Sequence, residues 1–227
     1  MNKPLALIVG VGDGLSASLA RLLHAEGYRL ALAARDTGKI AQLAKATNAT
    51  QHSCDASKPD QVEQLFSELD GPLRVAIYNP SARVRGPITE LDPEAVRSAI
   101  EITAFGAFLV GQRAARLMLE QGEGTILFTG ATAGVKGFAH SASFAMGKFA
   151  QRGLSHSMSR ELHPQNIHVA WVNIDGGIRS SRREEPTDRP DSLLDPDAIA
   201  QSYLHLIRQH RSAWSCEIEV RPWQENF

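Results

Sequence analysis

Residues 5–20 read Leu-Ala-Leu-Ile-Val-Gly-Val-Gly-Asp-Gly-Leu-Ser-Ala-Ser-Leu-Ala, which is an apolar strand pattern followed by a glycine-rich loop and a helix pattern. In this arrangement, backbone N–H groups and the N-terminus of the helix point toward a bound pyrophosphate. Glycine is needed there because a Cβ atom would keep the backbone away from the phosphates. We therefore expect the phosphates of a nicotinamide dinucleotide at Gly10, Gly12, Asp13, Gly14 and Leu15.

The rest of the chain repeats this alternation of strand and helix patterns, which is typical of βαβ units that build a parallel sheet. Strands are predicted at Leu5–Val9, Arg29–Ala33, Thr50–Ser53, Leu73–Tyr78, Gly124–Phe128, Ile167–Val172 and Cys216–Val220. Helices are predicted at Leu15–Ala25, Lys39–Ala46, Gln61–Leu69, Pro93–Gln121, Ser143–Leu162 and Asp197–Gln209, with Asp36, Asp92 and Asp195 as N-caps. The fold class is therefore α/β: one domain over residues 1–227, with a Rossmann-type, doubly wound, seven-stranded parallel sheet and helices on both faces.

Composition and charge restrict the class of protein. With 24 Lys and Arg against 25 Asp and Glu, the net charge of -1 favours neither a nucleic acid nor a membrane as partner. Cys54 and Cys216 are too few for a disulfide framework and lack metal-ligand spacing, so both are interpreted as small buried hydrophobes and no metal site is expected. No signal peptide or membrane-spanning run is visible, which together with the cysteines favours the cytoplasm.

The end of the second predicted strand bears on which dinucleotide binds. It reads Ala-Ala-Arg-Asp, and Arg35 suits the 2′-phosphate of NADP, whereas Asp36 is explained as the cap of the next helix. Asp13 opposes this reading, because its negative charge lies in the phosphate loop. NADP is favoured, and NAD remains open.

These elements resemble the short-chain dehydrogenase/reductase family over essentially the whole chain. The family's glycine motif matches the loop at residues 9–16, and its adenine-contacting Asp matches Asp55. Its Asn-Ala-Gly turn keeps only Asn79, and its nicotinamide-holding turn matches residues 175–180, which places Ile178 and Ser180 beside the carboxamide. The resemblance implies that these residues bind the cofactor.

The catalytic residues of the family are mostly replaced, so the chain is identified as a divergent member with an incomplete tetrad. The family's Tyr and the Lys four residues later share one helix face, where the ammonium lowers the phenol pKa and contacts the ribose. Here this pair is Phe144 and Lys148, the family's Ser aligns with Ala131, and its Asn aligns with Thr103. Only Lys148 is retained.

His140 is the best replacement for the missing acid by its chemistry, because an imidazole titrates near neutrality. It precedes the helix that carries Lys148, in a segment that borders the substrate pocket in the family; the alternative is an exposed loop histidine. Thr129 and Thr132 flank the position of the lost Ser, where they either orient a substrate oxygen or hydrogen-bond within the protein.

Two further segments point to substrate binding and assembly. The polar run at residues 179–195, which includes Arg179, Arg182 and Arg189, is interpreted as a substrate lid. The helix at residues 93–121 is apolar nearly all round, and the tail carries Trp214 and Trp223, so a homodimer or homotetramer is expected.

We therefore expect an NAD(P)-dependent oxidoreductase that transfers hydride to a small carbonyl, enone or quinone-like substrate through an altered active site. The reason for this expectation is that the sequence carries a complete cofactor-binding pattern, which a predicted lid follows. The alternative is a catalytically inactive dinucleotide-binding sensor or scaffold, in which Lys148 is kept only for binding.

Overall fold

The computed structural model describes residues 3–181 and 183–224, and over these residues the strands form one parallel sheet of seven members. The strands are β1 (Leu5–Val9), β2 (Arg29–Ala34), β3 (Thr50–Ser53), β4 (Leu73–Tyr78), β5 (Gly124–Thr129), β6 (Ile167–Ile174) and β7 (Glu217–Val220). Their order is β3-β2-β1-β4-β5-β6-β7, so the chain changes direction across the sheet between β1 and β4. Ligands of doubly wound folds bind at this switch point, beyond the carboxyl ends of the strands.

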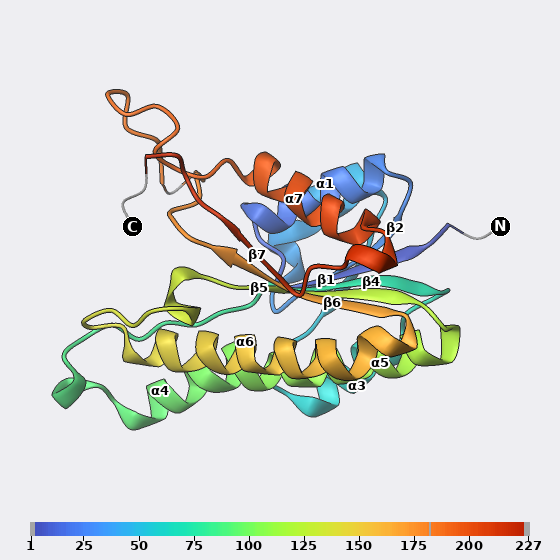
Figure 1. Ribbon diagram of the computed structural model, residues 1–227, viewed down its shortest axis with the longest axis horizontal. Helices are drawn as coiled ribbons and strands as arrows, with labels where there is room; N and C mark the ends of the chain where they lie inside the picture. The colour runs from blue at the N-terminus through green and yellow to red at the C-terminus, as the bar shows by residue number, and fades with distance from the viewer. Residues whose placement is uncertain (1–2, 182, 225–227) are drawn as a thin grey trace.

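Helices cover both faces of the sheet, as predicted (Figure 1). One layer contains α1 (Leu15–Ala25), α2 (Ala41–Thr47) and α7 (Pro196–Arg208). The other contains α3 (Pro59–Ser67), α4 (Pro93–Ile100), α5 (Gly106–Gln121) and α6 (Ala142–Leu162). The side chains of β1 alternate between the two layers, because Leu7 packs in the core on the α5 side and Ile8 in the core on the α1 side.

The three predicted N-caps are confirmed by their hydrogen bonds. Asp36 accepts from Gly38 N, Asp92 from Glu94 N and Ala95 N, and Asp195 from Asp197 N. The helix predicted from 39 to 46 differs, because a 3₁₀ turn at Thr37–Ile40 precedes α2.

The helix predicted from Pro93 to Gln121 is interrupted by a π-helical turn at Glu101–Phe105. Such a turn leaves backbone carbonyls without their usual partners in the helix. Tyr78, which is buried in the sheet packing, donates its hydroxyl to the carbonyl oxygen of Ile102. The side chain of Gln151 donates to the carbonyl oxygen of Thr103. Contacts with distant parts of the chain therefore support the turn, which hydrophobic periodicity alone does not reveal.

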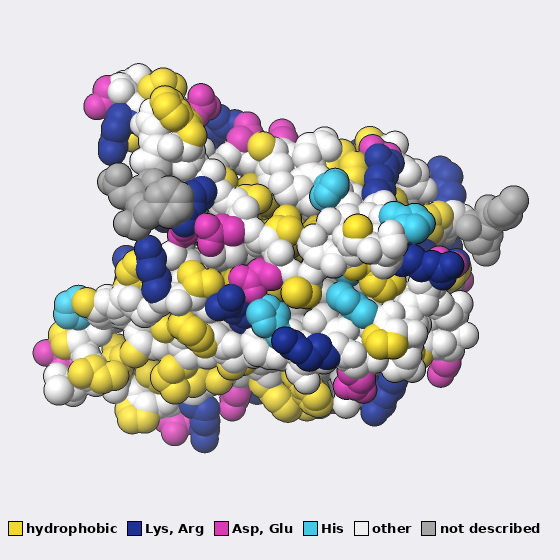
Figure 2. Space-filling model, in the orientation of Figure 1, with side chains coloured by type: hydrophobic (Ala, Val, Ile, Leu, Met, Phe, Trp, Pro, Cys, Tyr) yellow, Lys and Arg dark blue, Asp and Glu magenta, His cyan; other side chains and the backbone are white. Residues whose placement is uncertain are grey.

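Exposed aromatic side chains lie on the layer that contains α4, α5 and α6. Phe105, Phe108, Met146 and Phe149 are all more than two-fifths exposed, and the rings of Phe105 and Phe108 stack. Hydrophobic side chains gather over this layer in Figure 2. The apolar surface predicted for the helix after Pro93 is thus present.

The two cysteines differ. Cys54 is buried, as expected, but Cys216 is exposed, so its interpretation as a buried hydrophobe is wrong. The reason is that Cys216 precedes β7, which is an edge strand with β6 as its one neighbour. The cysteines lie by β3 and β7 at opposite edges of the sheet, and both are free thiols. Among the described residues, no helix has the length and apolar character that a membrane span requires.

Candidate functional site: a cofactor cleft beside an altered catalytic position

The glycine loop after β1 has its glycines for two different reasons. Gly10 has φ of +80°, and a Cβ atom there would lie 2.6 Å from Cγ of Pro80, so this position requires glycine for the fold. Gly12 and Gly14 have no heavy atom within 4 Å of the place where a Cβ would be. They border a cavity of about 520 Å³, which Leu15 also lines. The loop therefore leaves open space in which backbone N–H groups can meet a phosphate.

Asn79 holds this loop in place from the end of β4. Its Nδ2 donates to Ser16 Oγ at 2.7 Å and to Gly10 O at 3.3 Å, while Ser16 Oγ donates to the same carbonyl at 3.1 Å. The amide N–H groups of Asn79 are thus engaged with the protein, although its side chain also lines the cavity. Asn79 orders the loop across the switch point between β1 and β4.

A second cavity of about 420 Å³ continues from the loop toward the ends of β2 and β3, where Arg35 and Asp55 line it. Burial opposes ionisation of Asp55, but hydrogen bonds from the side chain and backbone of Ser57 and the charge of Arg35 outweigh it and lower the pKa of the carboxyl. An ionised acceptor and a guanidinium therefore face one cavity. Asp13 does not line this cavity, because its carboxylate accepts a hydrogen bond from Ser181 Oγ at 3.0 Å.

Lys148 lies on α6 and is almost fully buried, with 2 % of its surface exposed. Its Nζ donates to Thr129 O and to Gln151 Oε1, and an ammonium keeps one further N–H for the cavity that Lys148 lines. Burial, aided by the charge of Arg83, lowers the pKa of Lys148 to about 7. The side chain is thus held rigidly and titrates near neutrality.

Thr103, aligned with the family's Asn, is buried and does not line the cleft. Its Oγ1 accepts from Ala82 N at 3.0 Å, and its carbonyl oxygen accepts from Gln151 Nε2 at 3.2 Å. Gln151 therefore joins the π-helical turn to Lys148. The structure gives Thr103 a positioning role and not a place at the reacting atoms.

Phe144 and Ala131 lie together with Lys148 on the 520 Å³ cavity, as their alignment predicted. Both also line an adjoining cavity of about 480 Å³, which His140 borders. His140 is exposed and has a left-handed backbone with φ of +59°. The structure thus brings four of the five predicted catalytic positions to connected cavities, and it places Thr103 behind them.

Thr129 and Thr132 have partners within the protein. Thr129 Oγ1 lies 2.8 Å from the Tyr203 hydroxyl in a buried pair, and Thr132 Oγ1 donates to Asp175. Asp175, at the end of β6, also pairs with Arg221 of the tail. Of the two alternatives for these threonines, the contacts favour hydrogen bonding within the protein.

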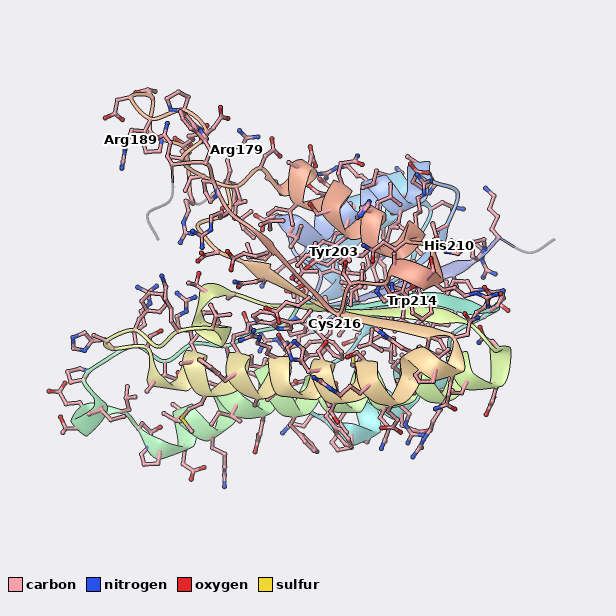
Figure 3. The ribbon with its side chains drawn as sticks, viewed as in Figure 1. Arg179, Arg189, Tyr203, His210, Trp214 and Cys216 are labelled. Carbon is pink, nitrogen blue, oxygen red and sulfur yellow. The ribbon has the colours of Figure 1, made fainter. Side chains whose placement is uncertain are left out.

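The segment at residues 179–195 projects from the end of β6 and carries Arg179 and Arg189, both labelled in Figure 3. Its base is closed by a bridge between Ile178 and Leu194, and Leu194 N donates to Gly177 O at 2.8 Å. Ile178 and Ser180 line the 520 Å³ cavity. Arg182, part of the predicted lid, lies outside the described residues.

Sequence reasoning missed several residues at these cavities. Gln151 follows Lys148 by three positions on one helix, a spacing that could have indicated their contact. Arg83 and Arg85 line the cavities without belonging to any motif, whereas Arg183, which also lines the 520 Å³ cavity, lies within the predicted lid. Arg83 and Arg85 alternate with Ala82 and Val84 after Asn79, and this alternation is the signal in the sequence that could have indicated them.

The residues present fit a dinucleotide. Two glycines face open space, Lys148 keeps a free N–H at one cavity, and Arg35 lies beside Asp55 at another. Phe144 and Ala131 have no hydroxyl group. The catalytic position therefore lacks both the Tyr that donates the proton in the family and the Ser that accompanies it. Hydride chemistry at this site therefore needs another source for the proton.

Comparisons with known proteins agree with this geometry. Residues 4–188 match the short chain dehydrogenase family. A crystal structure of a short-chain dehydrogenase from Rhodopseudomonas palustris is 35% identical, covers 98% of this chain and 100% of its own, and has a TM-score of 0.85. An uncharacterized oxidoreductase of Staphylococcus aureus (strain MRSA252) is 26% identical over 233 residues, covering 98% of both chains. A metagenomic short-chain oxidoreductase in complex with NADP is 24% identical, with 96% and 97% coverage and a TM-score of 0.84.

Proposed function

Since the chain belongs to the short-chain dehydrogenase family, we propose that it is an NAD(P)-dependent oxidoreductase that reduces a small carbonyl, enone or quinone-like compound. The observation that carries the proposal is the continuity of the cleft. The open glycine loop, Lys148 and Phe144 line one cavity, and Phe144 is shared with a second cavity large enough for a small substrate.

NADP is the proposed cofactor, with NAD as the alternative. Arg35 lines the cavity at the end of β2 and forms no ion pair with any described residue, so its guanidinium is available for a 2′-phosphate. Asp13 accepts a hydrogen bond from Ser181 and is not among the described residues that line this cavity, which supports NADP over NAD. The NADP bound by the metagenomic relative agrees with this preference.

When bound, the reduced nicotinamide would supply a hydride to the substrate carbon. The electron pair of the substrate's double bond would then move to the substrate oxygen, which takes one proton. Lys148 would hold the ribose through its remaining N–H, and Ile178 and Ser180, which line the same cavity, would position the carboxamide. The segment at residues 179–195 is proposed as the substrate lid, within one dinucleotide-binding domain that the sequence predicts over residues 1–227. Excluding water protects the hydride transfer.

The proton comes from His140 or from solvent, because neither Phe144 nor Ala131 can donate one. His140 borders the 480 Å³ cavity and is exposed, so bulk water can return its proton after each turnover. Replacing His140 with Gln should lower kcat about tenfold or more if the imidazole donates. An unchanged kcat assigns the proton to water.

The second candidate is a dinucleotide sensor or scaffold without turnover, favoured by the loss of both hydroxyls at Phe144 and Ala131. A sensor requires one redox form of the cofactor to bind more tightly than the other, since only differential affinity can shift a conformational equilibrium. Calorimetric titration with NADPH and NADP⁺ measures this difference. Equal affinities exclude the sensor.

We also propose a homodimer or homotetramer that buries Phe105, Phe108, Met146 and Phe149. These exposed side chains lie on one helical layer, and exposed apolar patches of this kind mark contacts between subunits. Sedimentation should give a dimer or tetramer at micromolar concentration, and Phe149→Ser should weaken it. A monomer at that concentration contradicts the proposal.

An acceptor screen tests the proposed function. Purified protein with NADPH is mixed with aldehydes, ketones, enones and quinones, and loss of the reduced nicotinamide is followed. The proposal expects saturable turnover with at least one acceptor class. Tight NADPH binding with no turnover across the whole panel would support the sensor instead.

A further inference from the structure

We propose that the 480 Å³ cavity binds substrates that carry a carboxylate or phosphate group, which Arg83 and Arg85 hold. This inference rests on the proposed function, because it defines the substrate class of that same site. The cavity is lined by Arg83, Arg85 and His140, and among the described residues no carboxylate side chain lines it or the adjoining cofactor cavity. The charged side chains that line the reacting end of the cleft are therefore all basic.

The two arginines are presented by a segment that is anchored at every second residue. Three backbone amides donate hydrogen bonds to the π-helical turn, to α6 and to the segment before α6. They run from Ala82 N to Thr103 Oγ1 at 3.0 Å, from Val84 N to Ser143 Oγ at 2.9 Å, and from Gly86 N to His140 O at 3.3 Å. Ser143 Oγ also donates to Val84 O at 3.0 Å. Anchoring alternate residues leaves the residues between them for the cavity, and these residues are Arg83 and Arg85.

Arg83 is fixed further by Phe144. The guanidinium carbon lies 3.8 Å from the centroid of the Phe144 ring, which is a cation–π contact. Burial, together with the charges of Arg85 and Arg183, lowers the pKa of Arg83, so these cations lie in one another's field. Mutual repulsion of this kind is relieved when an anion binds between the cations.

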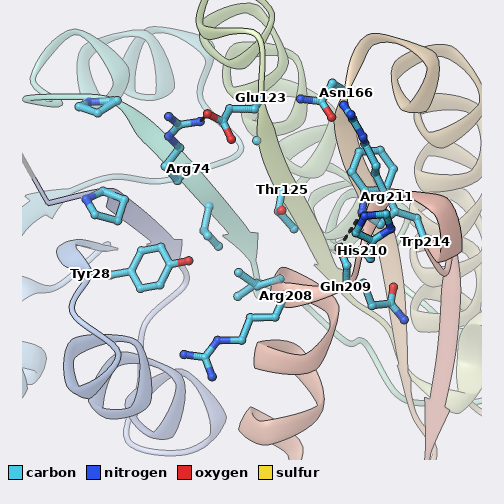
Figure 4. Close-up of a pocket in the computed structure, with 15 residues that line it drawn as sticks. Tyr28, Arg74, Glu123, Thr125, Asn166, Arg208, Gln209, His210, Arg211 and Trp214 are labelled. Carbon is cyan, nitrogen blue, oxygen red and sulfur yellow. Dashed lines mark hydrogen bonds and ion pairs between the residues drawn. The ribbon is translucent and has the colours of Figure 1, made fainter.

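The pocket at the opposite end of the sheet provides a contrast (Figure 4). It has a volume of about 690 Å³ and is also rich in arginine. There, Arg74 pairs with Glu123 and Arg208 pairs with Glu26. Its cations are therefore largely balanced by carboxylates of the protein itself.

Arg83 and Arg85, by comparison, form no ion pair with any residue in the described part of the chain. A guanidinium matches the two oxygens of a carboxylate or phosphate with parallel hydrogen bonds. Two such groups beside the position of the reacting carbon favour an anionic substrate over a neutral one of the same shape.

Binding of matched acid and ester pairs tests the inference without any turnover. Aliphatic and aromatic carboxylates of graded size, each with its neutral methyl ester, and phosphate monoesters, each with its neutral dimethyl triester, are titrated calorimetrically into the full-length protein with and without NADP⁺. We expect acids to bind at least tenfold more tightly than their esters. Higher ionic strength should reduce this preference. The carboxylate and phosphate arms identify which anion the site prefers.

Arginine variants connect the preference to these side chains. Arg83→Met and Arg85→Met should each weaken acid binding about tenfold and leave ester binding unchanged, whereas Arg85→Lys should retain part of the preference. Arg211→Met, an exposed position at the opposite pocket, is the matched control and should bind like the wild type. Acids that bind no better than esters, or a preference that survives both Met variants, overturn the inference.

The binding assay and the acceptor screen together separate this inference from the proposed function. If acids bind through Arg83 and Arg85 and no acceptor is reduced, the proposed oxidoreductase activity fails and the anion site stands. If neutral acceptors are reduced and acids show no advantage in binding, the activity stands and the anion site fails.

Discussion

The guanidinium carbon of Arg83 lies 3.8 Å from the centroid of the Phe144 ring, at the helix position where the short-chain dehydrogenase family has its proton-donating Tyr. A fixed cation thus stands beside the place of a missing hydroxyl. Its charge contributes to the low pKa of Lys148, one helical turn further along α6. A guanidinium and a ring without a hydroxyl group therefore lie together at the position where the family has its Tyr.

Restoring the phenol should raise the rate of carbonyl reduction. In Phe144→Tyr, a hydroxyl returns beside the ammonium of Lys148, and a positioned general acid contributes about 10² in kcat. Steady-state reduction of an active aldehyde measures the effect. Glu161→Gln, an exposed change near the far end of the same helix, is the control and should leave kcat unchanged. An equal kcat for Phe144→Tyr and wild type would mean that protonation does not limit this enzyme.

The buried Lys148 should make stability depend on pH. The unfolded chain keeps the proton of this lysine up to about its ordinary pKa of 10.5, while the folded protein releases it near 7. Between these values the unfolded state binds more protons, so the free energy of unfolding rises with pH. Urea unfolding at pH 6.5 and 9, compared with Lys148→Met, isolates this contribution. The prediction is contradicted if the free energy of unfolding of the wild type, relative to that of Lys148→Met, does not rise between pH 6.5 and pH 9.

Two glycines of the phosphate loop should respond differently to alanine. Gly10→Ala brings a Cβ to 2.6 Å from Pro80 at a positive φ and should cost about 1–3 kcal/mol of unfolding free energy. Gly12→Ala meets open space within the protein, so stability should change by less than about 1 kcal/mol. NADPH affinity should nevertheless fall about tenfold in Gly12→Ala, because its methyl group enters the phosphate space. Unchanged affinity there would place the phosphates elsewhere.

Arg35 should determine the preference for the phosphorylated cofactor. In Arg35→Ser the affinity for NADPH should fall about tenfold, because a charge-assisted contact to the 2′-phosphate is lost. The affinity for NADH should not change. Lys39→Ser, which removes an exposed cation nearby in the chain, is the control. Equal losses for both cofactors would show that Arg35 supports the loop and not the phosphate.

Local signals in the chain were sufficient for the glycine loop, the N-caps and the spacing of Phe144 and Lys148, because each depends on residues close in sequence. The π-helical turn at Glu101–Phe105 depends instead on Tyr78 and Gln151, which come from other elements. No pattern within the helix indicates it.

The cationic cavity was missed for the same reason. Arg83 and Arg85 lie in a segment outside the helices and strands, and its course depends on hydrogen bonds that its backbone amides donate to Thr103 and Ser143. The exposure of Cys216 likewise follows from the edge position of β7, which is a property of the sheet order. Such features require the tertiary arrangement.

Transfer of deuterium tests the central claim, hydride transfer at this cleft, most directly. NADPH deuterated at C4 of the nicotinamide on either face is mixed in single turnover with the acceptors of the screen, and the products are examined by mass spectrometry. We predict that one deuterium moves to the acceptor carbon from one face of the cofactor only. Saturable NADPH binding with no labelled product from any acceptor would contradict the claim and leave a dinucleotide-binding protein without redox activity.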